Sequence, residues 1–358
     1  MTLLAPTAPP RRPNPVTQTY TALAQTVRDR GLLSRTRWFY GLLLIGLGLA
    51  LGGVVTGFIL LDDSWLQLLM AAALGVLLTQ LAFVGHEASH RQVLSSGPAN
   101  DRLGWLLAVV CVGMSYSWWM NKHTRHHGNP NKLGKDPDIE IDTFSFEEES
   151  AATRRGFKAW FTRRQGLFFF PLLLLEGINL HLKSVQSLWE NRRIAGRRLE
   201  LTVLVARLVI YLTAVFLVLP LGMAFAFVGL QLAVFGLYMG ASFAPNHKGM
   251  PIVPREIKLD FLAKQVRTSR NVTGGWWATA LMGGLNFQIE HHLFPSMPRT
   301  QLRKARLLVL EHCRTLDVPY TETSLLRSYA IVIDYLNRVG LSARDPFDCP
   351  LAGRLRGV

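Results

Sequence analysis

Residues 65–84 (WLQLLMAAALGVLLTQLAFV) carry no charged side chain and lead directly into Gly85-His86-Glu87-Ala88-Ser89-His90. A helix needs about 20 apolar residues to cross the roughly 30 Å hydrocarbon core of a bilayer, so this run is long enough to span it. Residues 38–61 form a second uncharged run of similar length, and two aspartates separate the two runs. Together they predict a transmembrane hairpin that ends at His86 and His90.

The composition indicates a basic membrane protein. Of the 358 residues, 49% are apolar and only 18% are charged, whereas an ordinary chain is about 25% charged. The 39 Lys and Arg outnumber the 24 Asp and Glu, which gives a net charge of +15. A wholly disordered chain has low hydrophobicity, and a disulfide scaffold needs more than the three cysteines present. Because the basic residues lie in loops between apolar runs, they favour an anionic membrane surface over nucleic acid.

Seven of the ten histidines fall into three groups, each beside an apolar segment. The groups are His86/His90, His123/His126/His127 and His291/His292, and Gln288 precedes the last at the same spacing. Residues three or four apart share one face of a helix, so each group can point two or three donors at one place. Imidazole binds iron, zinc, copper and nickel, and seven imidazoles exceed the ligands of one tetrahedral metal. The spacing therefore predicts a two-metal site.

The three groups can share one centre only if they lie on the same membrane face. Basic residues before the first span favour a cytoplasmic N-terminus, so the hairpin 38–84 returns the chain to the cytoplasm. Apolar runs between about 203 and 245 predict a second hairpin, which preserves the side. The apolar stretches 103–120 and 166–180 are then expected to be re-entrant or interfacial.

These observations predict an all-α polytopic membrane protein with about four transmembrane helices in two hairpins. A cytoplasmic helical cap would carry the dimetal site. The expected parts are a cytoplasmic N-terminal segment (1–37), a membrane domain (38–340) and a C-terminal tail (341–358). Both termini and the metal site are expected on the cytoplasmic side.

The first histidine group admits another interpretation. His86-Glu87-x-x-His90 matches the H-E-x-x-H pattern of zinc metalloproteases, in which two His bind zinc and the Glu activates water. An intramembrane protease of that kind would leave five clustered histidines unexplained, because a catalytic zinc takes three protein ligands. A metal transporter would carry ionisable residues inside the spans, and these spans are almost free of them.

The motifs resemble those of the membrane fatty acyl desaturases and their hydroxylase relatives. That family has three histidine boxes, H-x-x-x-H, H-x-x-H-H and H/Q-x-x-H-H. The similarity covers about residues 40–340 and includes Gly128-Asn129-Pro130-Asn131, Asp136-Pro137-Asp138 and Leu293-Phe294-Pro295. Gln288 is similar to the third box of a subgroup that contains front-end desaturases. Those often carry a fused cytochrome-b5-type domain with a His-Pro-Gly-Gly motif, which is absent from this sequence.

The resemblance implies an O2-dependent enzyme that introduces a double bond into a fatty acyl chain, held as acyl-CoA or acyl-lipid, at a non-haem di-iron centre. A fatty-acyl or lipid hydroxylase on the same scaffold stays an alternative. Electrons would come from an external donor such as a ferredoxin or a flavoprotein reductase. The resemblance implies no nucleic-acid partner and no catalytic residue beyond the metal ligands.

The resemblance also implies a histidine ligand after the last span, where His247 stands. The expected metal ligands are His86, His90, His123, His126, His127, His247, Gln288, His291 and His292. His181, alone on an apolar segment, is a weaker candidate, and the sequence leaves open whether it or Gln288 binds metal. The position of the double bond, the chain length and the carrier also stay open.

Charged residues beside the boxes have expected roles as well. Glu87 is expected to hydrogen-bond a metal ligand, because outer carboxylates often orient ligating histidines. Lys122, Arg125 and Lys132 are candidate contacts for the head of an acyl substrate or for anionic lipid.

Overall fold

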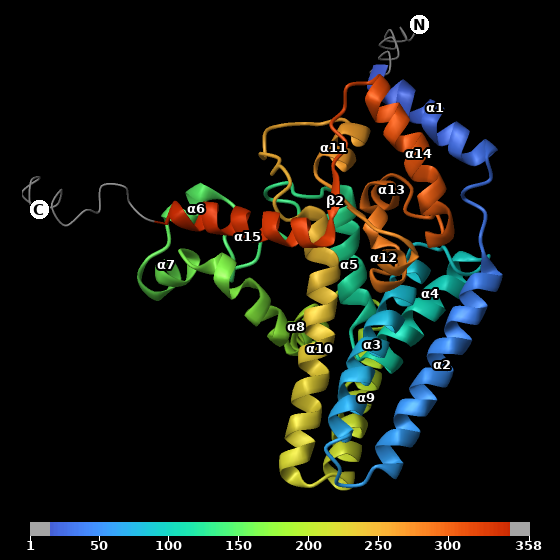
Figure 1. Ribbon diagram of the computed structural model, residues 1–358, viewed down its shortest axis with the longest axis vertical. Coiled ribbons are helices and arrows are strands. Elements are labelled where there is room, and N and C mark those ends of the chain that lie inside the picture. Colours follow the sequence, from blue (N-terminus) through green and yellow to red (C-terminus); the bar gives the residue numbers. More distant parts are fainter. Residues whose placement is uncertain (1–14, 344–358) are drawn as a thin grey trace, which may run out of the picture.

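The computed structural model describes residues 15–343, with side chains from residue 19 onward (Figure 1). Within this part, helices dominate, and the strands are β1 (Asn271–Thr273) and β2 (Glu322–Ser324), which pair in parallel. The longer helices are α1 (Pro15–Asp29), α2 (Arg37–Leu60), α3 (Gln67–Ser89), α5 (Tyr116–Gly128), α8 (Gln165–Glu190), α9 (Arg197–Val218), α10 (Leu221–His247), α14 (Arg299–Thr315) and α15 (Leu325–Leu341). The shorter ones are α4 (Gly97–Trp105), the π-helical η1 (Leu106–Val112), α6 (Glu148–Ala152), α7 (Gly156–Thr162), α11 (Phe261–Arg267), α12 (Trp276–Leu281), the 3-10 helix η2 (Leu285–Phe287) and α13 (Gln288–Leu293). The all-α expectation is confirmed.

Five of the described helices are long and apolar enough to cross a membrane: α2, α3, α8, α9 and α10. The pairs α2/α3 and α9/α10 form the two expected hairpins (Figure 1). Large apolar side chains such as Leu49 on α2 and Leu217 on α9 are mostly exposed, as lipid-facing residues are. The membrane character expected from the sequence is therefore supported by the fold.

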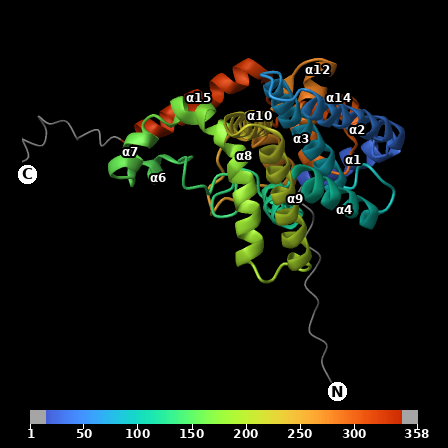
Figure 2. The same ribbon diagram turned by 90° about the horizontal axis from the view of Figure 1, so that it is seen from below.

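The fifth apolar helix, α8, extends the stretch 166–180 as far as Glu190. Figure 2 shows α10 nearly end-on and α8 at almost its full length, so α8 runs across the direction of α10. Its length exceeds what the sequence indicated. That this stretch does not cross the membrane stays a prediction.

A bend of 118° separates α4 and η1 from α5, inside the apolar stretch 103–120. The turn falls at Gly113, which has a left-handed φ of 88°. A Cβ at this position would lie 2.9 Å from a guanidinium nitrogen of Arg207. Glycine is required there by conformation and by space. The bend is consistent with the expectation that this stretch is not one straight crossing.

The bundle packs tightly where α10 meets α8. A Cβ on Gly236 would lie 2.3 Å from the backbone nitrogen of Gly177, so the two glycines let the helices approach closely. α10 also packs along α3 (Figure 1). His86 lies in the last turn of α3 and His247 ends α10. The packing therefore brings both histidines to the same end of the bundle.

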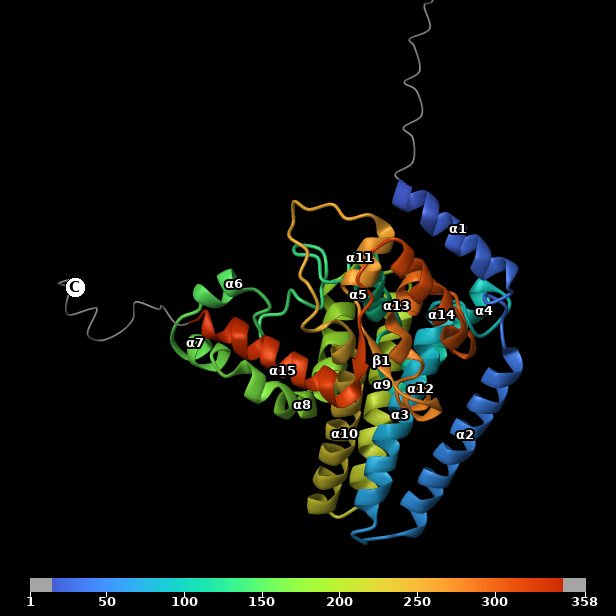
Figure 3. The same cartoon turned by 45° about the horizontal axis from the view of Figure 1, so that its top comes forward.

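A cap of α11–α14 covers this end (Figures 1 and 3). Its apolar core includes Leu262 of α11, Ile289 of α13 and Leu302 of α14, all at most 2% exposed. Helix α1 contributes Val27 to the same core, and Tyr20 donates a hydrogen bond to the carbonyl of Leu293 at 2.9 Å. The described part of the N-terminal segment thus packs against the cap and helps to hold α13.

Candidate metal centre

All nine predicted ligands lie together at the junction of bundle and cap. They form two groups of donor atoms. His86, His90, His123, His127 and His291 make the first group, and His126, His247 and His292 make the second, with all donor atoms of each group within 4.8 Å of one another. Gln288 joins the second group, since its amide nitrogen lies 2.9 Å from His247 Nε2. A half-turn of this amide would present its carbonyl oxygen instead.

The division between the groups follows helix geometry. Residues four apart stay together: His123 with His127, and Gln288 with His292. The intervening His126 and His291 join the opposite groups. Successive side chains on a helix diverge by about 100°, because there are 3.6 residues per turn. Each His-His pair therefore points its two rings at two different centres.

The donor atoms fit two metal ions. Both ring nitrogens of His86 and of His127, and Nε2 of His291 and His292, are buried and have no hydrogen-bond partner. A buried polar atom without a partner costs free energy, which a metal bond would remove. Nitrogens on opposite sides of a metal lie about 4.2 Å apart, given bonds of roughly 2.1 Å. The spread within each group is close to that span.

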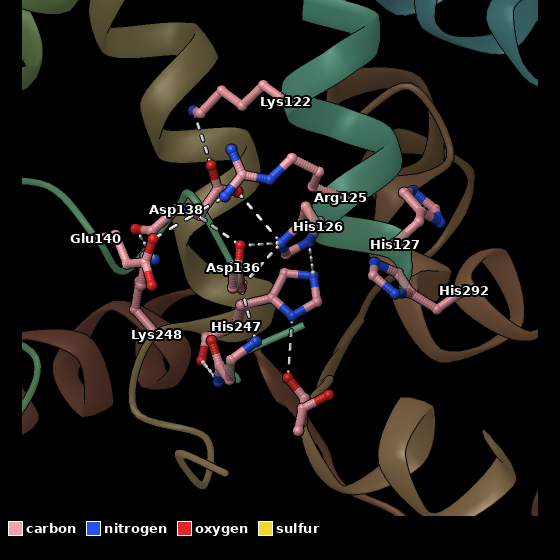
Figure 4. Close-up of polar contacts among 12 residues, drawn as sticks. Lys122, Arg125, His126, His127, Asp136, Asp138, Glu140, His247, Lys248 and His292 are labelled. Atoms are coloured by element: carbon pink, nitrogen blue, oxygen red, sulfur yellow. Dashed lines mark hydrogen bonds and ion pairs between the residues drawn. The ribbon is translucent and has the colours of Figure 1, made fainter. Parts of the chain in front are cut away.

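Carboxylates hold His126 from its outer side, as Figure 4 shows. His126 Nδ1 lies 3.0 Å from an oxygen of Asp136, while its Nε2 lies 3.3 Å from His247 Nε2. Asp136 is fixed in turn, because it accepts a hydrogen bond from the backbone N–H of Asn131 at 2.7 Å. A carboxylate on the remote ring nitrogen orients a metal-binding histidine. The Asp136-Pro137-Asp138 segment therefore supports the second group.

The carboxyl groups of Asp136 and Asp138 both have a pKa below the usual value. Burial alone would raise the pKa of Asp138, but Lys122, His126 and Lys248 hold this pKa well below its usual range. Burial likewise opposes ionisation of Asp136, and His126 lowers the pKa of that carboxyl below its usual value. Their negative charge favours a cation beside His126.

The other two histidines of the second group are also held at Nδ1. His247 Nδ1 lies 2.9 Å from the carbonyl of Thr268, and His292 Nδ1 lies 2.9 Å from the amide oxygen of Gln265. Each carbonyl accepts the Nδ1 proton, which leaves Nε2 without a proton and free to bind metal. Burial lowers the pKa of His292 well below the usual value, and it does the same for His291 of the first group. The rings of His291 and His292 are therefore neutral, as metal ligands must be.

Glu87 differs from the expectation. It contacts Arg299 and Tyr40 and makes no hydrogen bond to a histidine side chain in the described structure. Tyr40 donates to Glu87 Oε1 at 2.8 Å, and Arg299 Nε donates to the same oxygen at 2.6 Å. Both carboxylate and guanidinium are buried. Glu87 thus joins α2, α3 and α14 beside the first group.

Glu290 lies on α13 between the predicted ligands Gln288 and His291, and its carboxylate is also hydrogen-bonded within the protein. Its carboxylate accepts hydrogen bonds from Tyr320 at 2.7 Å and from Asn271 at 2.8 Å. Burial raises the pKa of Glu290 to about 7, against the lowering effect of these two donors. The side chain anchors α13 to the short sheet.

The weaker candidate His181 lies outside both groups. Its Nδ1 is 2.7 Å from the carbonyl of Gly113, and it belongs to no metal-sized cluster among the described residues.

The basic residues beside the second box are engaged within the protein. Lys122 pairs with Asp138 at 2.7 Å, Arg125 lies 4.0 Å from Glu140, and Lys132 donates to the carbonyl of Ile257.

His86 is one of the residues that line a small, mostly apolar cavity of about 30 Å³. Its lining comes from α3, η1, the turn before α5, α5 itself and α10, and includes Ala82, Ala108, Val112, Met114, Trp119 and Phe243. A slender apolar group placed in it would lie beside the first histidine group. Trp119 of α5 is part of this wall.

Several supporting residues carry no sequence signal. Gln265 and Arg299 lie in ordinary polar contexts of the cap segments, and Tyr40 lies within an apolar run. Only their tertiary contacts reveal them. Asp136 could be suspected, because it closely follows the second box.

Comparisons with known proteins give matches to one enzyme family. The family model described as fatty acid desaturase matches residues 63–324. A Delta(8)-fatty-acid desaturase of Helianthus annuus is 26% identical over 353 residues, which cover 92% of this chain and 75% of the relative. An acyl-lipid (9-3)-desaturase of Borago officinalis is 28% identical over 304 residues, covering 81% and 68%. A Delta(6)-fatty-acid desaturase of Caenorhabditis elegans is 26% identical over 348 residues, covering 90% and 75%.

Proposed function

Because the chain belongs to the fatty acid desaturase family, it is a membrane oxidoreductase of lipid metabolism, and we propose that it desaturates acyl chains with dioxygen at a pair of irons. The observation that carries this proposal is the division of the nine predicted ligands into two groups, with buried ring nitrogens that lack partners. We assign five ligands to one iron and four, including Gln288, to the other.

The choice of iron rests on chemistry. A site made of imidazoles suits iron, zinc or copper, and zinc cannot exchange electrons. Two bound irons would supply the reduction of dioxygen and the removal of hydrogen from unactivated methylenes. The overall reaction takes one pair of adjacent methylenes, one O2, two electrons and two protons. It yields one carbon–carbon double bond and two water molecules.

The protein's own residues position the substrate and the ligands. We propose that the acyl chain reaches the metals along the apolar walls of the cavity beside His86, and that these side chains move apart to admit it, because the cavity of about 30 Å³ is smaller than a chain. Asp136, Thr268 and Gln265 hold three ligating rings at their remote nitrogens. This arrangement keeps the rings aimed at the metals before substrate arrives.

The protease alternative is disfavoured by the position of Glu87. A protease base must reach a metal-bound water, but both oxygens of Glu87 are bound by Arg299, and one of them also by Tyr40. The five ligands of the first group also exceed what a catalytic zinc uses.

We further propose that the chain is carried as acyl-CoA or acyl-lipid and that an external reductant supplies the electrons. We also propose that both termini and the metal centre are cytoplasmic, a proposal supported by the basic residues that precede the first span. The proposed ligand set is the one expected from the sequence, without His181.

Expression in a bacterial host that makes saturated fatty acids tests the function. Gas chromatography of the host lipids should show new unsaturated species, and the purified protein should contain about two irons per chain, as a two-metal site requires. His126→Ala should insert into the membrane and yield no such product. A protein with one zinc and no new unsaturated lipid contradicts the proposal.

A further inference from the structure

A cationic surface lies on the outside of the cap, directly over the metal centre. We define it by the cations Lys135, Arg255, Lys258, Lys264 and Arg267, together with Ile257 and Phe261, which are exposed in the same loop and at the start of α11. The residues come from the loop after α5, the loop before α11, and α11 itself. Figures 1 and 3 show α11 and this loop at the end of the molecule opposite the turns of the two hairpins. The surface therefore faces water and not the bilayer.

The five cations of this surface outnumber the two carboxylates of the same segment, Glu256 and Asp260, so the surface keeps a net positive charge. None of its five cations forms an ion pair within the described residues. Lys132 lies buried beneath it and adds a further charge. Burial, together with Lys132 and Lys135, lowers the pKa of Lys264. An acidic partner would relieve this repulsion.

The apolar centre points to a protein partner. Ile257 is 47% exposed. Phe261 is 42% exposed, although one edge of its ring packs against Tyr20 of α1. Apolar residues within a charged rim are typical of protein–protein interfaces. Anionic lipid is disfavoured, since the surface is on the far side of the cap from the membrane helices (Figure 3).

Helix α11 joins this surface to both metal groups. Lys264 Nζ donates to the carbonyl of Gly128 at 2.6 Å, at the end of the helix that carries three ligands. The next residue, Gln265, donates to the carbonyl of His127 at 2.9 Å and accepts from His292 Nδ1 at 2.9 Å. One side chain thus contacts a ligand residue of each group. Helix α11 thus lies directly between this surface and the metal-binding histidines.

We propose that this cationic surface docks an acidic one-electron carrier protein and that electrons enter through α11. The inference rests on the proposed function, in which each double bond consumes two electrons from outside. Two reduced carriers would each be oxidised by one electron, and the two protons would come from water. A small, charge-steered contact suits such an exchange, because electron-transfer encounters bury less than about 1,200 Å².

The test uses the full chain in nanodiscs of zwitterionic lipid, with a plant-type [2Fe–2S] ferredoxin and its reductase as the probe. The variant K135E/K258E reverses two exposed charges of the surface. We expect the ferredoxin KM and the Kd measured by calorimetry to rise about tenfold at low ionic strength, and the difference to shrink as salt is added. Iron content should match the wild type.

The matched control is R303E/K304E, which makes the same charge change on exposed residues of α14. It should leave the ferredoxin KM and Kd within about twofold of the wild type, because its charges lie outside the docking surface. Equal effects of the two variants, no effect of K135E/K258E, or no ferredoxin binding to the wild type overturns the docking site. A wild type that binds iron and gives no unsaturated product with any donor overturns the proposed function as well.

Discussion

Glu87 and Arg299 stand 212 positions apart in the chain and form a buried ion pair between α3 and α14. Glu87 lies between His86 and His90, and Arg299 follows His292 by seven residues. The pair therefore ties the first histidine box to the third. Tyr40 adds a hydrogen bond from α2, so three helices meet at one carboxylate.

Arg299→Ala is expected to destabilise the protein by about 3–5 kcal/mol, because it leaves the Glu87 charge buried without an opposite charge. Thermal unfolding in detergent, followed by near-UV circular dichroism, measures the loss. Arg306→Ala is the control, since the Arg306–Glu322 pair is about a quarter exposed and such pairs contribute no more than about 1 kcal/mol. Equal losses from both variants would show that the buried pair has no special weight.

Glu87→Gln separates the two enzyme classes. The amide keeps the shape of the carboxylate and can still accept from Arg299 and Tyr40, so partial desaturation is expected. A protease that used Glu87 as its base would lose all activity. Product analysis by gas chromatography, at equal protein level in the membrane, measures the outcome. Complete loss of desaturation with two irons retained would contradict the supporting role assigned to Glu87.

The long helices with continuous apolar runs were predictable from the sequence. The helices against which they pack were not. The expected hairpin 38–84 appeared as α2 and α3, and the expected hairpin between about 203 and 245 appeared as α9 and α10. Uncharged length and helical spacing are local properties. The extent of α8 was missed, because polar residues after Leu180 obscured its apolar face.

For the metal site, too, the sequence predicted the local pattern and not the tertiary contacts. The spacing within each box placed the histidines together, but it did not say which ring served which group. That division follows from the 100° step between neighbours once α5 and α13 are known to be helical. Gln265 and Arg299 act through contacts across 27 and 212 positions. No local pattern encodes such a contact.

His126→Ala and His123→Ala are expected to lower metal content at different irons. His126 belongs to the second group and His123 to the first, so each variant should retain about one iron per chain, since the other group keeps its ligands. Mass-spectrometric metal analysis gives the count, and Mössbauer spectra of the two variants should differ. His181→Ala is the control and should keep two irons. Loss of iron from His181→Ala would contradict the ligand set.

Gln265→Leu is expected to weaken iron binding by about 10–100-fold, the usual cost of removing an outer partner of a ligating histidine. The leucine has similar volume and cannot accept the Nδ1 proton of His292. Titration of iron-loaded protein with a chelator measures the affinity. Gln186→Leu, at an exposed position of α8, is the control. An unchanged chelator midpoint would show that Gln265 does not orient His292.

Ala108→Phe should shorten the acyl chains that the enzyme accepts. Ala108 lines the cavity beside His86, and a phenyl ring in place of its methyl group would fill part of that space. Chains that must extend past this point would lose turnover by tenfold or more, since a misfit of one or two methylenes in an apolar pocket costs about 1–3 kcal/mol. Competition between fed fatty acids of different length, read by gas chromatography, gives the ratio. Val110→Phe, on the partly exposed side of η1, is the control and should leave the chain-length profile unchanged. An unchanged profile in Ala108→Phe would mean that the substrate reaches the metals by another route.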